Sequence, residues 1–377
     1  MPAELCTVLP DQPYKGKLSA KHTAEIIKVA CNPPEYNARH ITTTGLQSLG
    51  FDDENISNPL LKNSGISIDN EMTVVPARIL PVPRLTYLEQ GREGIRASDA
   101  SWRLMNIKFY KGARLDRWAV LVIKDGPRSG PGYPNDVSVE TTVGRFVAEC
   151  KNLGIHVGSE EPTYLNVTLP RPNRNDPSRS NAIQEIRKTI RGLRQIPELL
   201  FVVLPNTSTE IYAGLKRLCD VELDVHTVCV QWNQLRKAQE RYFANVALKV
   251  NMKLGGVNHI LERNTPSSKW LLERPTMIVG MDVTHSSPGS QQYTPSVAAV
   301  VASVDDCFAQ FPVSLEIQKS RQEEIAYLEK MMVERITAYK AKSGRLPERI
   351  LVYRDGVSEV NDFSLLTCFL ELKSVIY

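Results

Sequence analysis

Short β-branched apolar runs alternate with amphipathic stretches between Trp118 and about residue 254. Apolar residues in the amphipathic stretches recur three or four positions apart, as on one face of a helix. Strands are predicted at WAVLVIK, LLFVVLP and HTVCVQ, with helices around 143–153, 182–193, from 207 onward and 240–254. This alternation of strand and helix predicts a parallel α/β sheet.

A second α/β pattern follows a segment rich in proline, serine and charged residues at Glu262–Pro275. Strands are predicted at TMIVGMDVTH, SVAAVVASV and FPVSLEIQ, followed by a long helix over about 321–342 and a strand at RILVYRDG. Three strands, a crossover helix and a strand that ends in Asp355 form the opening topology of a ribonuclease H-like fold. Periodicity alone also permits other α/β arrangements.

Residues 1 to about 115 show no such alternation. They are rich in proline, asparagine and threonine, with one clear helical pattern from Ser19 to Ala30, and we interpret them as a connecting region without a core. The sequence thus predicts an irregular N-terminal linker region over 1–117, an α/β domain over 118–262 and a second α/β domain over 263–377.

Composition narrows the class of protein only slightly. The 377 residues are 42% hydrophobic and 23% charged, as in ordinary globular proteins, and the net charge of +4 does not by itself indicate a polyanionic partner. Seven cysteines without a CxxC pair argue against a zinc site or a disulfide framework. Since no signal peptide or membrane span is apparent, we expect a soluble cytoplasmic protein that does not enter a membrane.

Two pairs of side chains in the first α/β pattern share helix faces. Tyr212 and Lys216 are four residues apart in IYAGLKR, and Lys249 and Lys253 are four apart in LKVNMKLGG. One interpretation is a phosphate site. The other is that the lysines extend from half-buried helices and the tyrosine belongs to the edge of the core, and the residues alone leave both open.

The start of the helix predicted from Thr207 also suits an anion. Thr207 and Glu210 match a capping box, so free backbone N–H groups would lie at that helix end. Upstream, the segment 163–195 is either a nucleic-acid-facing stripe or an ordinary solvated loop and helix. Its basic residues are Arg171, Arg174, Arg179, Arg187, Lys188, Arg191 and Arg194.

Three carboxylates are candidates for metal chemistry. Asp282 and Asp355 end the strands TMIVGMD and RILVYRD, and Glu323 opens the long helix. Neighbouring strand ends would let the two aspartates share a divalent cation, as metal-dependent phosphodiester cleavage requires. The ordinary interpretations are turn-forming aspartates and a capping box of Ser320 with Glu323.

In chain order, IYAGLKR, CVQ, LKVNMKLGGVNHIL, GMDVTH, SRQEE and VYRDGVSE resemble the middle and PIWI domains of eukaryotic Argonaute proteins. The order and spacing match over about 118–359, and YRDGVSE together with KLGGVN is highly specific. EMTVVPARILPVPRLTY resembles the end of a PAZ domain and the linker after it. The resemblance implies a Rossmann-like middle domain and an incomplete ribonuclease H-like PIWI domain, and we expect a fungal source.

The resemblance further implies that a small guide RNA binds in RNA silencing and pairs with a complementary target RNA. Tyr212 would stack on the first guide base, and the loop Asn206–Thr209 would inspect the edge of that base. Val228 replaces a glutamine that contacts the phosphate in many relatives, which removes one expected hydrogen bond. The guide 5′ phosphate would be held by Lys216, Lys249, Lys253, Gln231 and the backbone of Cys229.

By the same resemblance, Asp282, Glu323 and Asp355 correspond to the first three members of a catalytic Asp, Glu, Asp, His set. Asp282 and Asp355 would be the Mg²⁺ ligands. The fourth member has no counterpart after Asp355, and His285 is a different position. Residues after Glu359 no longer resemble the family. We therefore expect weak or absent Mg²⁺ binding and loss of the pockets for silencing partner proteins.

Three functions follow as hypotheses. The first is guide-RNA binding with little or no cleavage. The second is RNA-guided endoribonuclease activity, which would need the missing ligand from a longer isoform or another chain. The third, a generic nucleotide-binding α/β protein, has no support from a GxGxxG or GxxxxGK[ST] motif. An incomplete PIWI domain would also leave apolar sheet surface uncovered.

Overall fold

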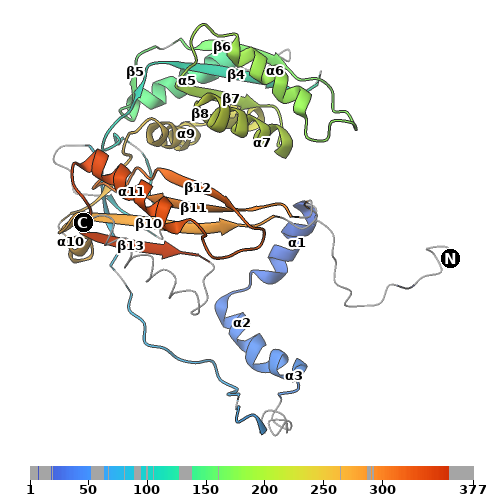
Figure 1. Cartoon of the computed structure of the whole chain (residues 1–377), viewed down its shortest axis with the longest axis vertical. Coiled ribbons are helices and arrows are strands. Elements are labelled where there is room, and N and C mark those ends of the chain that lie inside the picture. Colours follow the sequence, from blue (N-terminus) through green and yellow to red (C-terminus); the bar gives the residue numbers. More distant parts are fainter. Residues whose placement is uncertain are drawn as a thin grey trace. The chain divides into compact units, whose positions relative to one another are not determined.

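The chain divides into two compact units, the first reaching Pro81 and the second containing most of the chain from Val82 onward. A computed structural model describes residues 7, 18, 20–51, 63–66, 68–79, 81–88, 95–98, 101–104, 106–126, 138–159, 161–263, 265–286, 290 and 293–355. All four sheets of the described part belong to the second unit (Figure 1).

The described part of the first unit is helical over residues 20–48 and irregular over residues 68–79. Helix α1 (Ala20–Ala30) confirms the predicted helix, and it is followed by α2 (Pro34–His40), the π-helix η2 (Ile41–Gly45) and α3 (Leu46–Ser48). The helical run from residue 34 was not predicted. It begins with proline in the first turn, where the missing N–H is not needed for a helical hydrogen bond.

A four-stranded parallel sheet forms the centre of the first α/β part. Its order is β6-β4-β7-β8, and every neighbouring pair is parallel, which confirms the predicted sheet. The strands are β4 (Trp118–Lys124), β6 (Thr163–Thr168), β7 (Leu199–Leu204) and β8 (His226–Gln231). Strand β6 was not predicted because it lies at the edge and its mixed polar sequence is only partly buried.

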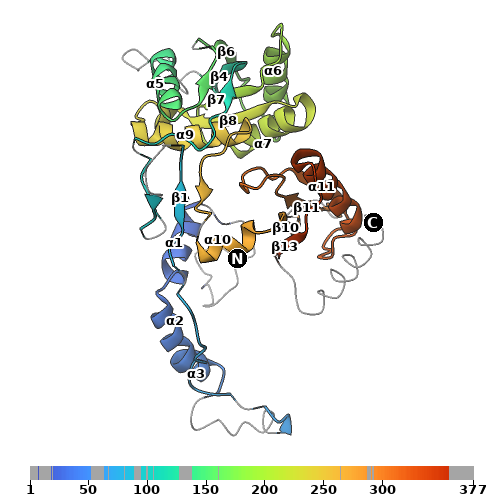
Figure 2. The same cartoon turned by 90° about the vertical axis from the view of Figure 1, so that its left-hand side faces the viewer.

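Helices cover both faces of this sheet (Figure 2). Since successive strand residues point to opposite faces, Val120 and Val122 of β4 pack in one core cluster and Leu121 and Ile123 in the other. The first cluster includes residues of α5 (Val139–Asn152) and α9 (Glu240–Lys253), and the second includes residues of α6 (Ser180–Arg191) and α7 (Thr209–Arg217). The helices η3 (Leu218–Leu223) and α8 (Trp232–Leu235) flank β8.

Residues just before the first sheet belong to its core, so the expectation that residues 1–115 contribute to no core is wrong for this part of the chain. Leu85, Phe109 and Leu115 are buried in the same cluster as α5 and α9. These apolar side chains are scattered among polar ones, so no periodicity revealed them. The short strands are β1 (Arg84–Thr86), β2 (Ile95–Arg96) and β9 (Ile260–Leu261) in one sheet, and β3 (Arg114–Leu115) with β5 (His156–Val157) in another.

The KLGGVN turn after α9 is organised by the buried side chain of Asn251. Its Oδ1 accepts the backbone N–H of Ala113 at 2.7 Å, and its Nδ2 donates to the carbonyl of Lys111 at 3.2 Å and to Oδ1 of Asn258 at 2.9 Å. A Cβ at Gly256 would lie 2.3 Å from the Asn251 Oδ1 atom, which explains why the turn requires glycine there.

The second sheet has the order β12-β11-β10-β13. Its antiparallel pairs are β10 with β11 and β11 with β12, whereas β13 is parallel to β10, as the predicted topology requires. The elements are α10 (Pro266–Leu272), β10 (Thr276–Thr284), β11 (Ser296–Ala302), β12 (Val313–Gln318), α11 (Leu328–Ser343) and β13 (Arg349–Arg354).

Helix α11 begins later than predicted. It starts at Leu328, and Arg321 has a φ of 60°, a left-handed conformation that a right-handed helix does not contain. The predicted helix start at 321 and the capping box of Ser320 with Glu323 are therefore wrong. Glu323 lies in the segment between β12 and α11.

The two faces of the second sheet differ in burial. Residues such as Val279 and Val300 pack against α11 on one face. On the other face Leu315, Ile317 and Tyr353 are 61%, 68% and 63% exposed. The described residues thus leave apolar sheet surface uncovered, as the sequence analysis expected.

Candidate functional site

Two lysine side chains from different helices converge on Thr227 of strand β8. Lys216 Nζ donates to Thr227 Oγ1 at 2.9 Å, and Lys253 Nζ donates to the Thr227 carbonyl at 2.9 Å. Tyr212 lies one helical turn before Lys216 on α7, and it is 48% exposed. The structure therefore brings two half-buried amines together, with an exposed aromatic ring on the same helix.

Charge and burial act differently on the two amines. Burial alone would lower the pKa of Lys216, but the hydrogen bond and the charge of Asp220, 2.6 Å away, outweigh it and raise that pKa. Burial and the positive charge of Lys216 lower the pKa of Lys253. A bound anion would favour the charged form of Lys253 and relieve the repulsion between the two lysines.

Of the remaining predicted phosphate residues, Lys249 and Cys229 lie near this pair, whereas Gln231 has no contact with it in the described part of the chain. Lys249 is exposed one turn before Lys253, and no hydrogen bond or ion pair of its side chain occurs among the described residues. Gln231 is half-buried and ends β8. Burial raises the pKa of the Cys229 thiol to about 11, although the charges of Lys216 and Lys253 oppose the shift, so this thiol is neutral at pH 7.

Sequence reasoning missed two members of this cluster. Asp220 follows Lys216 by four residues, a spacing that places both on one helix face and offered a signal. Thr227 offered none, because a threonine in a strand is an ordinary residue. Its role becomes visible only where the lysine side chains meet.

The start of α7 is capped one residue later than predicted. Ser208, not Thr207, is the capping residue, and its Oγ accepts the N–H of Ile211 at 3.3 Å. Asn206 Oδ1 accepts the N–H of Ser208 at 3.0 Å, which closes a turn before the helix. The predicted capping box of Thr207 with Glu210 is therefore wrong, because the helix begins at Thr209.

Two of the basic residues in the segment 163–195 form structural ion pairs. Arg179 Nη2 lies 2.7 Å from Asp125 Oδ1 in a buried position, and Arg187 Nη2 lies 2.6 Å from Glu222 Oε2. A uniform basic stripe is therefore not present. The basic residues of this segment that remain exposed are Arg171, Arg174, Lys188, Arg191 and Arg194.

The carboxylates Asp282 and Asp355 occupy neighbouring strand positions. The parallel register pairs Met281 with Arg354, so Asp282 and Asp355 come next on each strand, and the Asp355 N–H donates to the Met281 carbonyl at 3.2 Å. Asp282 lies inside β10 rather than at its end. Both side chains are exposed, and their oxygens are the ligands that Mg²⁺ prefers.

Glu323 is held by a different partner. Its Oε1 lies 2.7 Å from His285 Nε2, and His285 Nδ1 lies 2.7 Å from Ser296 Oγ. In the described part of the chain, no three His, Cys, Asp or Glu side chains are grouped closely enough to hold a metal ion. The donor set thus fits a divalent cation only in part, through Asp282 and Asp355.

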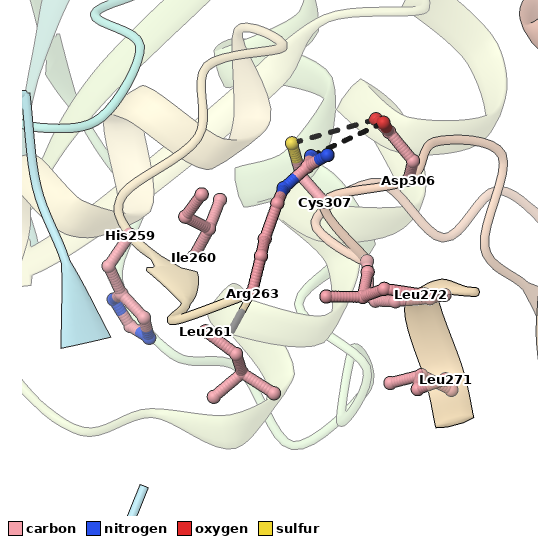
Figure 3. Close-up of a pocket in the computed structure, with 9 residues that line it drawn as sticks. His259, Ile260, Leu261, Arg263, Leu271, Leu272, Asp306 and Cys307 are labelled. Atoms are coloured by element: carbon pink, nitrogen blue, oxygen red, sulfur yellow. Dashed lines mark hydrogen bonds and ion pairs between the residues drawn. The ribbon is translucent and has the colours of Figure 1, made fainter. Parts of the chain in front are cut away.

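A separate cavity of about 170 Å³ contains none of the predicted site residues (Figure 3). Leu261, Leu271 and His259 line it, and Arg263 Nη2 lies 3.3 Å from Asp306 Oδ2 at its side. Burial and then the charge of Asp306 raise the pKa of the Cys307 thiol, which disfavours its thiolate form. We assign no chemistry to this cavity.

None of the helices within the described ranges has both the length and the apolar composition that crossing a lipid bilayer requires.

Sequence models of two protein families match this chain. The Argonaute linker 2 domain matches residues 36–87, and the Piwi domain matches residues 199–373. The second match starts inside the predicted middle domain and continues past Glu359, where the resemblance in the motifs ended.

Curated relatives match nearly the whole chain. Protein argonaute MEL1 of Oryza sativa subsp. japonica is 32% identical over 378 residues, which cover 95% of this chain and 34% of that protein. Protein argonaute 5 of Arabidopsis thaliana is 30% identical over 378 residues, which cover 95% of this chain and 35% of that protein. The chain thus spans about a third of the length of these relatives.

Solved structures share the fold. The crystal structure of the N. crassa QDE-2 AGO MID-PIWI domains has a TM-score of 0.57 at 26% identity, covering 72% of each chain. Kluyveromyces polysporus Argonaute with a guide RNA has a TM-score of 0.72 at 23% identity, covering 97% of this chain and 40% of that one. The predicted α/β fold class, with a ribonuclease H-like PIWI sheet, is confirmed.

The relatives above are plant proteins and the two structures are fungal, so the comparisons support a eukaryotic Argonaute without selecting the expected fungal source. Three findings point to the same family. The linker and Piwi domain models match in the expected order, Argonaute relatives match nearly the whole chain, and the fold is shared with solved Argonaute structures. The chain belongs to the Argonaute family.

Proposed function

We propose that this chain binds the 5′-phosphorylated end of a small guide RNA, which pairs with a complementary target RNA in RNA silencing. The observation that carries the proposal is the convergence of Lys216 and Lys253 on Thr227 of β8. The helix that carries Lys216 also exposes Tyr212. A K. polysporus Argonaute of the same fold was solved with a guide RNA, which supports this assignment.

A terminal phosphate would complement the charge of the two half-buried lysines at Thr227. Lys216 and Lys253 repel each other, and burial already disfavours the charged form of Lys253. A terminal phosphate carries nearly two negative charges at neutral pH and accepts several hydrogen bonds, so it offsets both costs. The exposed ring of Tyr212 offers the first base a stacking surface, and exposed Lys249 adds a third cation beside Lys253.

The test compares RNAs that differ only in a 5′ phosphate or a 5′ hydroxyl. Changing Lys249 or Lys253 to Ala removes a charge-assisted contact, so affinity for the phosphorylated RNA should fall by roughly 2 kcal/mol, or about thirtyfold. Affinity for the 5′-hydroxyl RNA should change little. Equilibrium binding to the full chain provides both values.

Lys188→Ala is the matched control, because Lys188 is an exposed lysine on α6, a helix that contributes none of the side chains gathered at Thr227. It should leave the preference for a 5′ phosphate unchanged. Equal affinity of the unmodified chain for both RNAs would rule out the proposal.

RNA-guided cleavage is the second candidate function. The neighbouring register positions of Asp282 and Asp355 favour it, since these residues would hold a divalent cation that activates water for phosphodiester hydrolysis. Glu323 opposes it, because its carboxylate is bonded to His285. We therefore propose that this chain binds Mg²⁺ weakly and binds a guide without cleaving the target.

A further inference from the structure

Side chains from three segments meet beyond the carboxyl ends of β4 and β7. Helix α5 follows β4 and α7 follows β7, and these helices pack on opposite faces of the sheet (Figure 2). In open parallel sheets, ligands bind at such a divergence point. In this chain Asp125, Arg179 and Asn206 meet there.

Arg179 and Asp125 form a buried bidentate ion pair. Their side chains are 10% and 8% exposed, with Nη2 to Oδ1 at 2.7 Å and Nη1 to Oδ2 at 3.3 Å. Arg179 Nη2 also donates to the Pro170 carbonyl at 3.1 Å. The Arg179 backbone has a φ of 55°, an unfavourable value outside glycine. Because burial of two charges and a strained backbone both cost free energy, stabilisation alone explains this arrangement poorly.

A line of hydrogen bonds connects this ion pair to the start of α7. The register of β4 with β7, continued past the strand ends, places Asp125 beside Asn206. Asn206 Nδ2 donates to Asp125 Oδ2 at 3.3 Å, and Asn206 Oδ1 accepts the N–H of Ser208 at 3.0 Å. Ser208 in turn caps α7, so the line ends on the helix that carries Tyr212.

We propose that Arg179 and Asp125 are positioning residues that set selectivity for the first base of the guide. This inference rests on the proposed function. A base stacked on Tyr212 presents its edge to the segment one helical turn earlier, which is the loop Asn206–Thr209. Asn206 fixes the turn of that loop, and the ion pair fixes Asn206.

The phosphate contacts do not pass through this network. Lys216 and Lys253 are held at Thr227, near the start of β8, whereas the ion pair lies beyond the end of β4. Selectivity among bases and affinity for the phosphate therefore depend on different residues. A change in the affinity ratio among first bases, with phosphate-dependent affinity unchanged, therefore supports the proposal, because general destabilisation would lower both.

The experiment measures binding of four 5′-phosphorylated RNAs that differ only in the first base to the full chain. The unmodified chain should prefer one base. The double variant Arg179→Met with Asp125→Leu replaces the pair with apolar side chains and leaves no buried charge unpaired. We expect the ratio between the best and worst base to fall about fivefold, the effect of about one hydrogen bond, while phosphate-dependent affinity changes less than about twofold.

The matched control is Arg187→Met with Glu222→Leu, which removes the other ion pair of α6 and should leave the base ratio unchanged. Asn206→Ala is a second test that does not threaten folding, since Asn206 is exposed, and it should reduce the ratio as the double variant does. If the double variant does not fold, Asn206→Ala decides the question.

Two results would overturn the proposal without touching the proposed function. A folded double variant, or Asn206→Ala, could keep the original base ratio, including the case in which binding of all four RNAs weakens equally, which indicates a structural role only. The unmodified chain could bind all four bases equally, which leaves 5′-phosphate binding intact. If the unmodified chain binds no 5′-phosphorylated RNA, the proposed function itself fails and this inference fails with it.

Discussion

At the scale of single residues, Asn251 has the clearest structural role. It is fully buried, and its amide satisfies the N–H of Ala113 and the carbonyl of Lys111. Asn251→Ala leaves the Ala113 N–H without this acceptor, whereas the Lys111 carbonyl still accepts the N–H of Val257 at 2.9 Å. We expect the free energy of unfolding of the second unit to fall by about 2–4 kcal/mol, measured by urea denaturation.

Asn152→Ala is the control for this prediction. Asn152 is exposed, and its amide reaches only Glu149 at 3.5 Å, so its replacement should change stability by less than about 0.5 kcal/mol. If Asn251→Ala has an effect as small as that, the hydrogen bonds of Asn251 do not hold the KLGGVN turn.

At the scale of elements, we expect the chain to self-associate through strand β12. It is an edge strand whose Leu315 and Ile317 side chains are 61% and 68% exposed. Charged or polar residues on an edge strand oppose pairing between molecules. Leu315→Lys with Ile317→Thr should therefore lower the average mass in light scattering and leave the melting temperature nearly unchanged.

Val300→Lys tests the opposite face of the same sheet. Val300 is fully buried against α11, and an unpaired lysine in that position should unfold the sheet. If the Leu315 and Ile317 changes destabilise the protein as much as Val300→Lys does, the outer face is covered in solution and the prediction is wrong.

At the scale of the whole molecule, we expect binding of a guide without cleavage of a complementary RNA. Among the described residues Asp282 and Asp355 offer Mg²⁺ two carboxylates, and the Glu323 carboxylate is hydrogen-bonded to His285 instead, whereas the ion prefers complete octahedral coordination. Incubation of the full chain with guide, target and Mg²⁺ should give no product. Metal-dependent cleavage at a fixed position that Asp282→Ala abolishes would contradict this prediction and would show that the chain cleaves RNA.

The sequence by itself determined most of the strands and helices of the two α/β parts and the helix faces of four candidate side chains. Alternating strand and helix patterns predicted the parallel sheet, and four-residue spacings placed Lys216 with Tyr212 and Lys253 with Lys249. These features were predictable because periodicity is local: each residue's face of a helix or strand depends on its near neighbours.

Only the tertiary structure decided which of these side chains act together. Arg179 resembled one more surface arginine until its ion pair with Asp125, 54 residues earlier, was visible. Glu323 matched a capping box, yet its carboxylate forms a hydrogen bond with His285, which lies 38 residues earlier in the sequence. Such contacts depend on how the chain packs, and no local pattern encodes a partner that folding brings from a distant segment.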